Sequence, residues 1–441
     1  MIKAAYITQF FYPDIHIAAQ RAMNFYRHLN RYLDMRLEVL TDSLNLEARV
    51  QNKSRLDTGG VIYLHPYRNN FQKNIFREST SFFKLLNKTL FLGRREKGLA
   101  AAIRRHPSLE KYGIYCVSVG PFRPFLELAG HLKRTYPGKK VIVEYRDIWV
   151  EGLDDFSARH NFAYPYSKTR SLYQKIAKNY GLNRRAAECE REVLPLVDRI
   201  VVVSEEMIKY FRQRMPGLDP GKFLHIPLGL DEEETRAPAD FREHKKPPGD
   251  HLSILYAGSL GNRDLRPLLE SIHRLRREGK VGKNQIRLTI IGRNGFYAKY
   301  LPQEYRSFVT FRASVPRAEI LKEYQKHDLL LLLINDWPKA ETTMTGKIFE
   351  LIESRRPILA LLPLAKDGCA RRLLEKTNSA FLAEVNDPAQ TGALLERMVE
   401  LKRQQQEISL ERKNMTWFHE NYSYGNICRK LYLECLRLTA G

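Results

Sequence analysis

The sequence predicts an α/β protein made of two doubly wound domains, each built on a parallel sheet. Short apolar, β-rich runs alternate with stretches of helical spacing almost from end to end, which is typical of parallel sheets. The alternation stops at one charged, proline-containing stretch and then starts again. The length of 441 residues suits two or three domains of about 100–200 residues each.

The elements of the first half follow in a regular order. Apolar side chains at helical spacing predict a first helix over residues 18–32. Apolar runs predict six strands, at residues 4–8, 37–41, 61–64, 115–119, 141–145 and 199–203. We expect these elements to form an N-terminal, Rossmann-like domain over residues 1–230.

The second half repeats the pattern after an interdomain linker. Residues 231–250 combine charges and prolines without periodicity, which is typical of a linker. Six further runs predict strands at residues 253–257, 287–291, 309–311, 329–334, 357–361 and 380–382. They predict a second Rossmann-like domain over 251–415. Residues 416–441 predict a final helix that packs back on the N-terminal domain. We expect the two sheets to face each other across a cleft, with ligands in the loops that follow the strands.

Composition excludes several classes of protein. Hydrophobic residues make up 43% of the chain and charged residues 28%, close to the soluble globular average. The longest apolar run has six residues, at 329–334, against the ~18–20 that span a bilayer. The N-terminus leads straight into a strand, so we expect a cytoplasmic protein. None of the five cysteines has Cys-x-x-Cys spacing, which argues against a zinc ribbon or a disulfide framework.

The net charge of +23 is unevenly distributed. Residues 1–230 hold 38 basic and 22 acidic side chains, and residues 231–441 hold 35 and 28. A basic first half indicates an anionic partner, such as phosphate groups, an anionic membrane or nucleic acid.

Two glycine-containing loops of the second domain follow predicted strands. Gly258 and Gly261 lie in a turn that leads into a helix, with Arg263 beside them. Backbone amides at a helix start favour a phosphate, although a plain glycine turn with a solvent-facing arginine fits as well. Gly292 and Arg293 repeat this arrangement one unit later, and there too a plain turn remains an alternative.

A third loop places a lysine at a helix start. The predicted helix begins near Gly346, with Lys347 in its first turn and Glu350 one turn further on. A cation at this end opposes the usual helix-dipole preference and makes better sense if an anion binds there. The alternative is a surface ion pair between Lys347 and Glu350.

Charged residues also follow strands of the first domain. Arg146 and Asp147 come directly after residues 141–145, either facing the cleft or forming a buried structural pair. Asp14, His16 and Arg21 lie in or just after the loop from the first strand to the first helix. We expect them on the acceptor side of the cleft, although Arg21 taken alone also fits a helix-surface arginine.

Several catalytic motifs are missing from the sequence. It has no Asp-x-Asp, His-Glu-x-x-His, Gly-x-Ser-x-Gly or Gly-x-x-x-x-Gly-Lys-Ser/Thr. The first strand also lacks Gly-x-Gly-x-x-Gly, which argues against a dinucleotide-dependent dehydrogenase.

Taken together, the loops resemble the retaining GT-B glycosyltransferases, in particular the large family 4. Six segments carry the resemblance in the family's order: 8–14 with 20–22, 145–149, 198–205, 226–231, 256–261, and 345–351 with 356–359. The resemblance implies transfer of a sugar from a nucleotide-sugar to an acceptor glycan or lipid-linked glycan, with retention. It also implies that the nucleotide-sugar is a substrate and that no cofactor or metal is needed. Cell-surface polysaccharide or glycolipid synthesis is the implied setting.

The resemblance also implies roles for individual residues. Arg263 and Lys347 would take the pyrophosphate in place of a metal, and Glu350 would accept hydrogen bonds from the ribose. The residues near the base and in the rest of the donor site would be Gly258, Gly261, Gly292, Arg293, Val315, Pro316, Thr342 and Gly346. Asp147, Arg146 and Arg123 would face the transferred sugar and the acceptor.

Four places depart from the family's pattern. The first of two family glutamates falls on Thr342, next to Glu341. His16 and Ile17 stand near a loop that usually has a glycine pair, and a family histidine is replaced near Arg123. Finally, Arg355 takes the place of a common helix-ending glycine.

Residues 68–105 combine ten basic side chains, two acids and several aromatic and leucine side chains. This mixture suits the interface of an anionic membrane, so a peripheral position at the inner face of the membrane is one expectation. An ordinary solvated helix pair with aromatic core residues is the alternative.

Three other functions remain open at this point. A nucleotide-sugar epimerase shares the fold, and a GT-B protein that has lost catalysis would bind or scaffold only. A nucleic-acid-binding protein is suggested by charge alone, without an RNA- or DNA-binding motif, and we expect no nucleic-acid partner.

Overall fold

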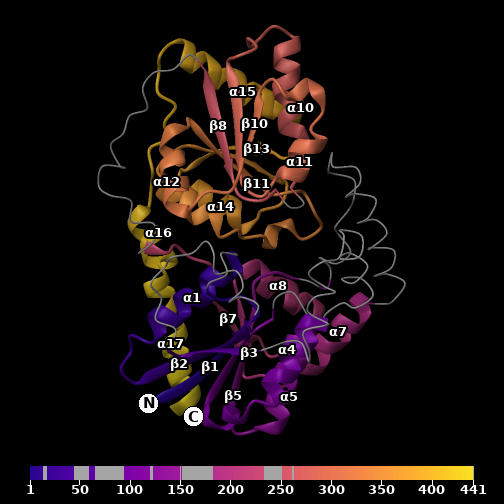
Figure 1. Ribbon diagram of the computed structural model, residues 1–441, viewed down its shortest axis with the longest axis vertical. Helices are drawn as coiled ribbons and strands as arrows, with labels where there is room; N and C mark the ends of the chain where they lie inside the picture. Colours follow the sequence, from indigo (N-terminus) through magenta and orange to yellow (C-terminus); the bar gives the residue numbers. More distant parts are fainter. Residues whose placement is uncertain are drawn as a thin grey trace. The chain divides into compact units, whose positions relative to one another are not determined.

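The computed structural model describes residues 1–12, 17–43, 59–64, 94–119, 123–148, 150, 182–232, 251–260 and 263–440. These residues form two compact units, each with its own parallel sheet (Figure 1). Unit 1 takes its described residues from 1–154, 173–229 and 421–441, and unit 2 from 230–420. The following predicted positions lie outside the described residues: Asp14, His16, Gly261, most of the linker 231–250 and most of the basic segment 68–105.

Within the described residues, the sheet of unit 1 has seven parallel strands in the order β3-β2-β1-β4-β5-β6-β7. Their bounds are β1 (Ile2–Ile7), β2 (Met35–Asp42), β3 (Val61–Leu64), β4 (Ile114–Ser118), β5 (Lys140–Tyr145), β6 (Arg199–Val202) and β7 (Phe223–His225). All strands are parallel, but the order in which they are added reverses at β1: β2 and β3 lie on one side of it, and β4 to β7 on the other. The place between β1 and β4 is therefore a topological switch point, where ligands bind in open α/β sheets.

Helices cover both faces of this sheet. They are α1 (Ile17–Leu29), α4 (Arg94–Arg104), α5 (Arg123–Thr135), α7 (Leu182–Val193), α8 (Glu205–Arg214) and α17 (Tyr424–Ala440). On one face, α1 and α17 lie side by side (Figure 1), and Phe25 and Tyr424 meet edge to face with ring centroids 6.5 Å apart. Helix α5 covers β4 and β5, and it packs against both α4 and α7. The last helix of the chain is therefore part of the core of unit 1.

In its described residues, unit 2 has six parallel strands in the order β10-β9-β8-β11-β12-β13. The strands are β8 (Leu252–Ala257), β9 (Ile286–Ile291), β10 (Val309–Arg312), β11 (Leu329–Leu333), β12 (Ile358–Leu362) and β13 (Ala380–Glu384). The helices are α10 (Arg266–Arg277), α11 (Gly295–Tyr300), α12 (Arg317–Lys326), α13 (Lys347–Glu353), α14 (Cys369–Lys376), α15 (Pro388–Arg403) and α16 (Met415–Tyr422). The switch point of this sheet lies between β8 and β11.

Helix α13, which carries Lys347 and Glu350, packs against α16. Phe349 stacks on Phe418 with ring centroids 6.3 Å apart, and the Glu353 carboxylate lies 2.8 Å from Nε2 of His419. Arg355, just after the helix, has φ +60°, a left-handed conformation that glycine adopts most easily. These contacts fix α13 with its first turn at the carboxyl edge of the sheet.

The predicted fold class is confirmed, because both sheets are parallel and flanked by helices. Each predicted strand coincides with an observed one to within two residues. Strand β7 is an additional strand that the sequence analysis did not predict. Its three residues, Phe223–His225, are all half-buried, so they form no continuous apolar run.

Candidate functional site

The turn after β8 leaves space for a lysine. Gly258 has φ +132°, in the region that favours glycine. A Cβ atom at this position would lie 2.5 Å from Nζ of Lys347. The Gly258 amide donates to the Ile291 carbonyl at 2.7 Å, which holds the turn against the end of β9. A side chain at this position would therefore displace the Lys347 ammonium.

The Lys347 ammonium lies over an aromatic ring. Its Nζ is 4.2 Å from the centroid of the Tyr256 ring, and the Tyr256 hydroxyl donates to the Ser259 carbonyl at 3.0 Å. Burial lowers the pKa of Lys347, and the charge of Arg263 lowers it further, while Tyr256 and Glu350 act in the opposite direction. The site thus holds a half-buried cation whose charge a bound anion would favour.

Arg263 brings a second cation to the same edge of the sheet. It is half-buried, and its Nε donates to the Leu333 carbonyl at 3.2 Å, at the end of β11. Lys347 and Arg263 therefore lie at the ends of the two strands that flank the switch point of unit 2. Two neighbouring cations at such a place suit a group with two negative charges, such as a diphosphate.

Glu350 is held by residues that the sequence analysis did not single out. One of its oxygens lies 3.0 Å from Nη2 of Arg317, and the buried Tyr324 hydrogen-bonds to it. The predicted alternative paired Glu350 with Lys347, whereas the structure pairs it with Arg317. Arg317 and Tyr324 are seven residues apart on α12, so helical periodicity places them on one face; this signal was open to sequence reasoning.

The loops after β8 and β9 are joined by Asn294. Its amide nitrogen donates to the Gly258 carbonyl at 2.8 Å, and its amide oxygen accepts from the Leu260 amide at 2.9 Å. Gly292 has φ +150°, and a Cβ there would overlap the Gly258 carbonyl. Arg293 is exposed in this loop. The two predicted phosphate loops therefore form one rigid surface, in which Asn294 is a residue that sequence reasoning missed.

Thr342, Gly346 and Pro316 lie around the same edge. Thr342 is buried, and its hydroxyl donates to the Lys339 carbonyl at 2.8 Å. Gly346 directly precedes α13, where the Thr345 hydroxyl accepts from the Lys347 amide at 3.3 Å. Pro316 is exposed just before α12. The Thr342 hydroxyl thus donates its hydrogen bond to a carbonyl of its own loop.

The residues predicted to face the transferred sugar and the acceptor lie in unit 1. Arg146 and Asp147 follow β5, where Arg146 is half-buried and Asp147 is exposed. Strand β5 itself contains one carboxylate, Glu144, which is buried. Burial by itself raises the pKa of Glu144, but the charges of Arg21 and Arg146 and two hydrogen bonds bring the net pKa below its ordinary value.

The structure corrects the expectation for Arg21. This side chain is 1% exposed, so it faces neither a ligand nor the solvent. Its guanidinium pairs with Glu144 and donates to the Ile226 carbonyl at 2.9 Å, while Tyr6 donates to the other Glu144 oxygen. Arg21 therefore links α1 to β5 and to the end of β7, and Glu144 extends this network to β1. A buried arginine must donate its N–H groups to protein acceptors, because no water reaches it.

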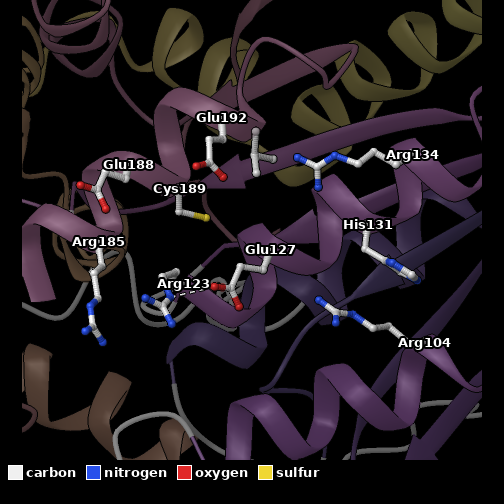
Figure 2. A pocket seen from close by; sticks show the side chains of 10 residues that line it. Arg104, Arg123, Glu127, His131, Arg134, Arg185, Glu188, Cys189 and Glu192 are labelled. Atoms are coloured by element: carbon white, nitrogen blue, oxygen red, sulfur yellow. Dashed lines mark ion pairs between the residues drawn. The ribbon is translucent and has the colours of Figure 1, made fainter.

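Arg123 is the first residue of α5 and lies 2.9 Å from the Glu127 carboxylate, one turn along the helix. It also lines a cavity of about 480 Å³ in unit 1 (Figure 2). Helix α5 follows β4, and the loop with Asp147 follows the neighbouring β5, so both begin at the carboxyl edge of this sheet. The predicted catalytic residues of unit 1 thus share one edge.

Two further searches concern metals and membranes. Among the described residues, no group of three or more His, Cys, Asp or Glu side chains is placed to hold a metal ion. No helix in that part of the chain is both long enough and apolar enough to cross a bilayer.

Comparisons with known proteins bear on the fold. No family model and no curated protein sequence matches the chain. Among solved structures, sucrose-phosphate synthase from Thermosynechococcus elongatus matches with a TM-score of 0.66 at 12% identity and covers 100% of both chains. HepE from Anabaena, in complex with UDP, matches with a TM-score of 0.61 at 13% identity, over 99% of this chain and 100% of that chain. The UDP-forming α,α-trehalose-phosphate synthase from Burkholderia xenovorans, in complex with glucose-6-phosphate, matches with a TM-score of 0.57 at 10% identity, over 98% and 100%. The chain therefore shares the GT-B fold of these glycosyltransferases, with two Rossmann-like domains.

Proposed function

We propose that the protein is a glycosyltransferase that moves a sugar from a nucleotide-sugar to an acceptor, with retention at the anomeric carbon. The observation that carries the proposal is the pair of cations at the switch point of unit 2. Lys347 lies over Tyr256 in the space that Gly258 leaves open, and Arg263 lies beside it. HepE, which has the same fold, has been solved with UDP and glucose.

The residues of unit 2 would hold the donor. Lys347 and Arg263 would bind the diphosphate and stabilise the charge that develops on it as the sugar leaves. Glu350, fixed by Arg317, would accept hydrogen bonds from the ribose hydroxyls. The bare backbone at Gly258 and Gly292 would let the diphosphate approach closely. The remaining donor contacts would come from Gly346, Arg293, Pro316 and Thr342.

The residues of unit 1 would serve the transferred sugar and the acceptor. Asp147 is exposed at the carboxyl edge, where it would face the sugar, and Arg146 and Arg123 would add positive charge nearby. We propose that no metal takes part, because two fixed cations already supply the charge that a divalent ion would bring to the diphosphate.

We further propose that the acceptor is a glycan or lipid-linked glycan of cell-surface polysaccharide or glycolipid synthesis, reached from the inner face of the membrane. The support is the basic first half of the chain and the basic and aromatic composition of residues 68–105. Changing Arg94 and Arg95 together to glutamate is expected to reduce co-sedimentation with anionic vesicles. Unchanged co-sedimentation would remove this part of the proposal.

A thermal-shift screen with UDP, GDP, ADP and their sugar conjugates tests the donor site, first without metal and then with magnesium. A ligand at a hundred times its Kd adds about 2.7 kcal/mol, a shift of a few degrees. We expect one nucleotide to stabilise the protein without metal, and the matching nucleotide-sugar to give a transfer product that retains the donor's anomeric configuration. Stabilisation without turnover on any acceptor would identify a binding protein instead, and no stabilisation at all would contradict the donor site.

A further inference from the structure

A cavity in unit 1 has a strongly charged lining. It measures about 480 Å³, within the range of about 300–1,000 Å³ that is usual for small-molecule sites. It lies along α5, between the side chains of α4 and α7 (Figure 2). Among the described residues, its lining consists of Arg104, Arg123, Glu127, His131, Arg134, Arg185, Glu188, Cys189, Glu192 and Val193.

One half of the cavity gathers cations. Arg104 ends α4, and His131 and Arg134 lie in the last two turns of α5. Figure 2 shows the guanidinium groups of Arg104 and Arg134 pointing to the same side of His131, whose ring points the other way. Both arginines are exposed. Within the described part of the chain, neither Arg104 nor Arg134 forms an ion pair or a side-chain hydrogen bond. Burial lowers the pKa of His131, and the charges of Arg104 and Arg134 lower it further.

The carboxylates of the cavity lie mainly in its other half and are mostly paired. Glu127 lies 2.9 Å from Arg123, and Glu188 lies 2.8 Å from Arg184. Glu192 on α7 is the remaining acid of the lining. Among the described residues, Arg104 and Arg134 are therefore not neutralised by an acidic partner, and they repel each other.

We propose that this cavity binds a phosphate group, carried either by a soluble sugar phosphate or by an anionic lipid headgroup. Guanidinium groups match phosphate oxygens two at a time, so Arg104 and Arg134 hold the phosphate from two sides, near enough to His131 for their charges to act on it. Bound phosphate also offsets the repulsion between the two guanidinium groups. Helices α4 and α5 both end near the start of the strand that follows them, at the amino edge of the sheet. The phosphate therefore sits apart from Asp147 and adds a site to the proposed transferase activity.

Isothermal titration calorimetry with inorganic phosphate and with glucose-6-phosphate tests the site on the full chain. We expect Arg104→Ala and Arg134→Ala each to weaken binding at least tenfold. Arg105→Ala is the matched control, because Arg105 is exposed, adjacent in sequence and absent from the lining, and it should change affinity less than twofold. Lys347→Ala controls for phosphate bound in unit 2 and should also leave this affinity unchanged. Melting temperatures of all four variants verify that they fold.

The pKa of His131 is a second measurement of phosphate binding. It would not respond to phosphate if the arginines had only a structural role. The charges that act on His131 are Arg104 from α4 and Arg134 from α5, and Glu127 lies one turn before it on α5. Phosphate favours the charged imidazole, so the pKa of His131 measured by NMR should rise when phosphate is added to the wild type. It should not rise in Arg104→Ala.

Vesicles distinguish the two sources of the phosphate. Co-sedimentation with phosphatidylglycerol vesicles but not with phosphatidylcholine vesicles, lost in Arg104→Ala and kept in Arg105→Ala, assigns the site to a lipid headgroup. Binding of glucose-6-phosphate without vesicle binding assigns it to a soluble ligand. The proposal is overturned if neither probe binds, if Arg105→Ala is as damaging as Arg104→Ala, or if only Lys347→Ala abolishes phosphate binding. The arginines would then be cations that stabilise two helix C-termini.

Discussion

Lys347 is the residue on which the proposed donor site depends most directly. Replacing it with alanine removes a charge-assisted contact worth about 1.5–3 kcal/mol, so the Kd for the stabilising nucleotide should rise about ten- to a hundredfold in calorimetry. Lys322→Ala, an exposed lysine on α12 of the same unit, is the matched control and should leave the Kd unchanged. Wild-type affinity in Lys347→Ala would show that the nucleotide binds elsewhere.

Gly258 tests the same site through the backbone. Gly258→Ala should destabilise unit 2 by about 1–3 kcal/mol, because alanine resists φ +132°. It should also weaken nucleotide binding, because the new Cβ would lie 2.5 Å from the Lys347 ammonium. Gly295→Ala is the control, since nothing lies within 4 Å of a Cβ at that position. Equal effects of the two substitutions on nucleotide affinity would contradict the role of Gly258 in making room for Lys347.

Glu144 provides a pH-dependent test of the buried network. Its folded-state pKa is lowered relative to an unfolded value of about 4.3. The ionised pair with Arg21 therefore adds stability above that pH, and this stability is lost as the pH falls through the folded-state pKa. Glu144→Gln should cost about 3–5 kcal/mol at pH 7, because it leaves Arg21 buried without its counter-charge.

Urea unfolding at pH 7, 5 and 3 measures this effect. The difference between wild type and Glu144→Gln should shrink as the pH falls below about 4.3, because the unfolded chain then takes up a proton on Glu144 before the folded protein does. Glu127→Gln, which breaks a half-buried, solvent-accessible pair with Arg123, should cost less than about 1 kcal/mol at every pH. A Glu144→Gln difference that stays constant from pH 7 to 3 would contradict the assigned linkage.

At the scale of elements, strands were the easiest feature to predict from the sequence. Strand β11 is buried along its whole length, so Leu329–Leu333 forms a continuous apolar run, whereas the half-buried β7 forms none. Of the site, Lys347 was predictable because an isolated cation at a helix start is unusual, and Gly258 because it ends a strand. The spacing of Arg317 and Tyr324 places them on one face of α12, but no local pattern shows that this face meets Glu350. The partners of Glu144 leave no pattern at all, since Tyr6 and Glu144 are 138 residues apart.

Helix α17 contributes to unit 1 although it comes from the far end of the chain. Leu431 is 2% exposed within the core that α17 shares with α1 and β1. Leu431→Ala should therefore cost about 2–5 kcal/mol in the free energy of unfolding. Leu433, two residues further on, is 43% exposed, and Leu433→Ala should stay within about 0.5 kcal/mol of wild type. Chemical denaturation of the two variants measures the contrast, and equal costs would argue against the packing of α17 in this core.

At the scale of the whole molecule, each unit has a hydrophobic cluster of its own among the described residues, and these two clusters have no residue in common. The core of unit 1 combines β1, β2 and β4 with α1 and α17, and that of unit 2 combines β8, β9 and β11 with α10 and α15. The excess of basic residues lies mainly in the first 230 residues, whereas the proposed donor site lies in unit 2. The basic surface and the proposed nucleotide site therefore belong to different units, and substitutions can perturb each of them separately.

Differential scanning calorimetry tests this separation. We expect two unfolding transitions, because each core is large enough to fold cooperatively. The stabilising nucleotide should raise the melting temperature of one transition by a few degrees, and Lys347→Ala should cancel that rise. Leu431→Ala should lower the other transition and leave the nucleotide-dependent one in place. If the nucleotide and Leu431→Ala instead shift one common transition, the two units unfold as a single cooperative body, and the stabilities of unit 1 and unit 2 cannot be varied independently.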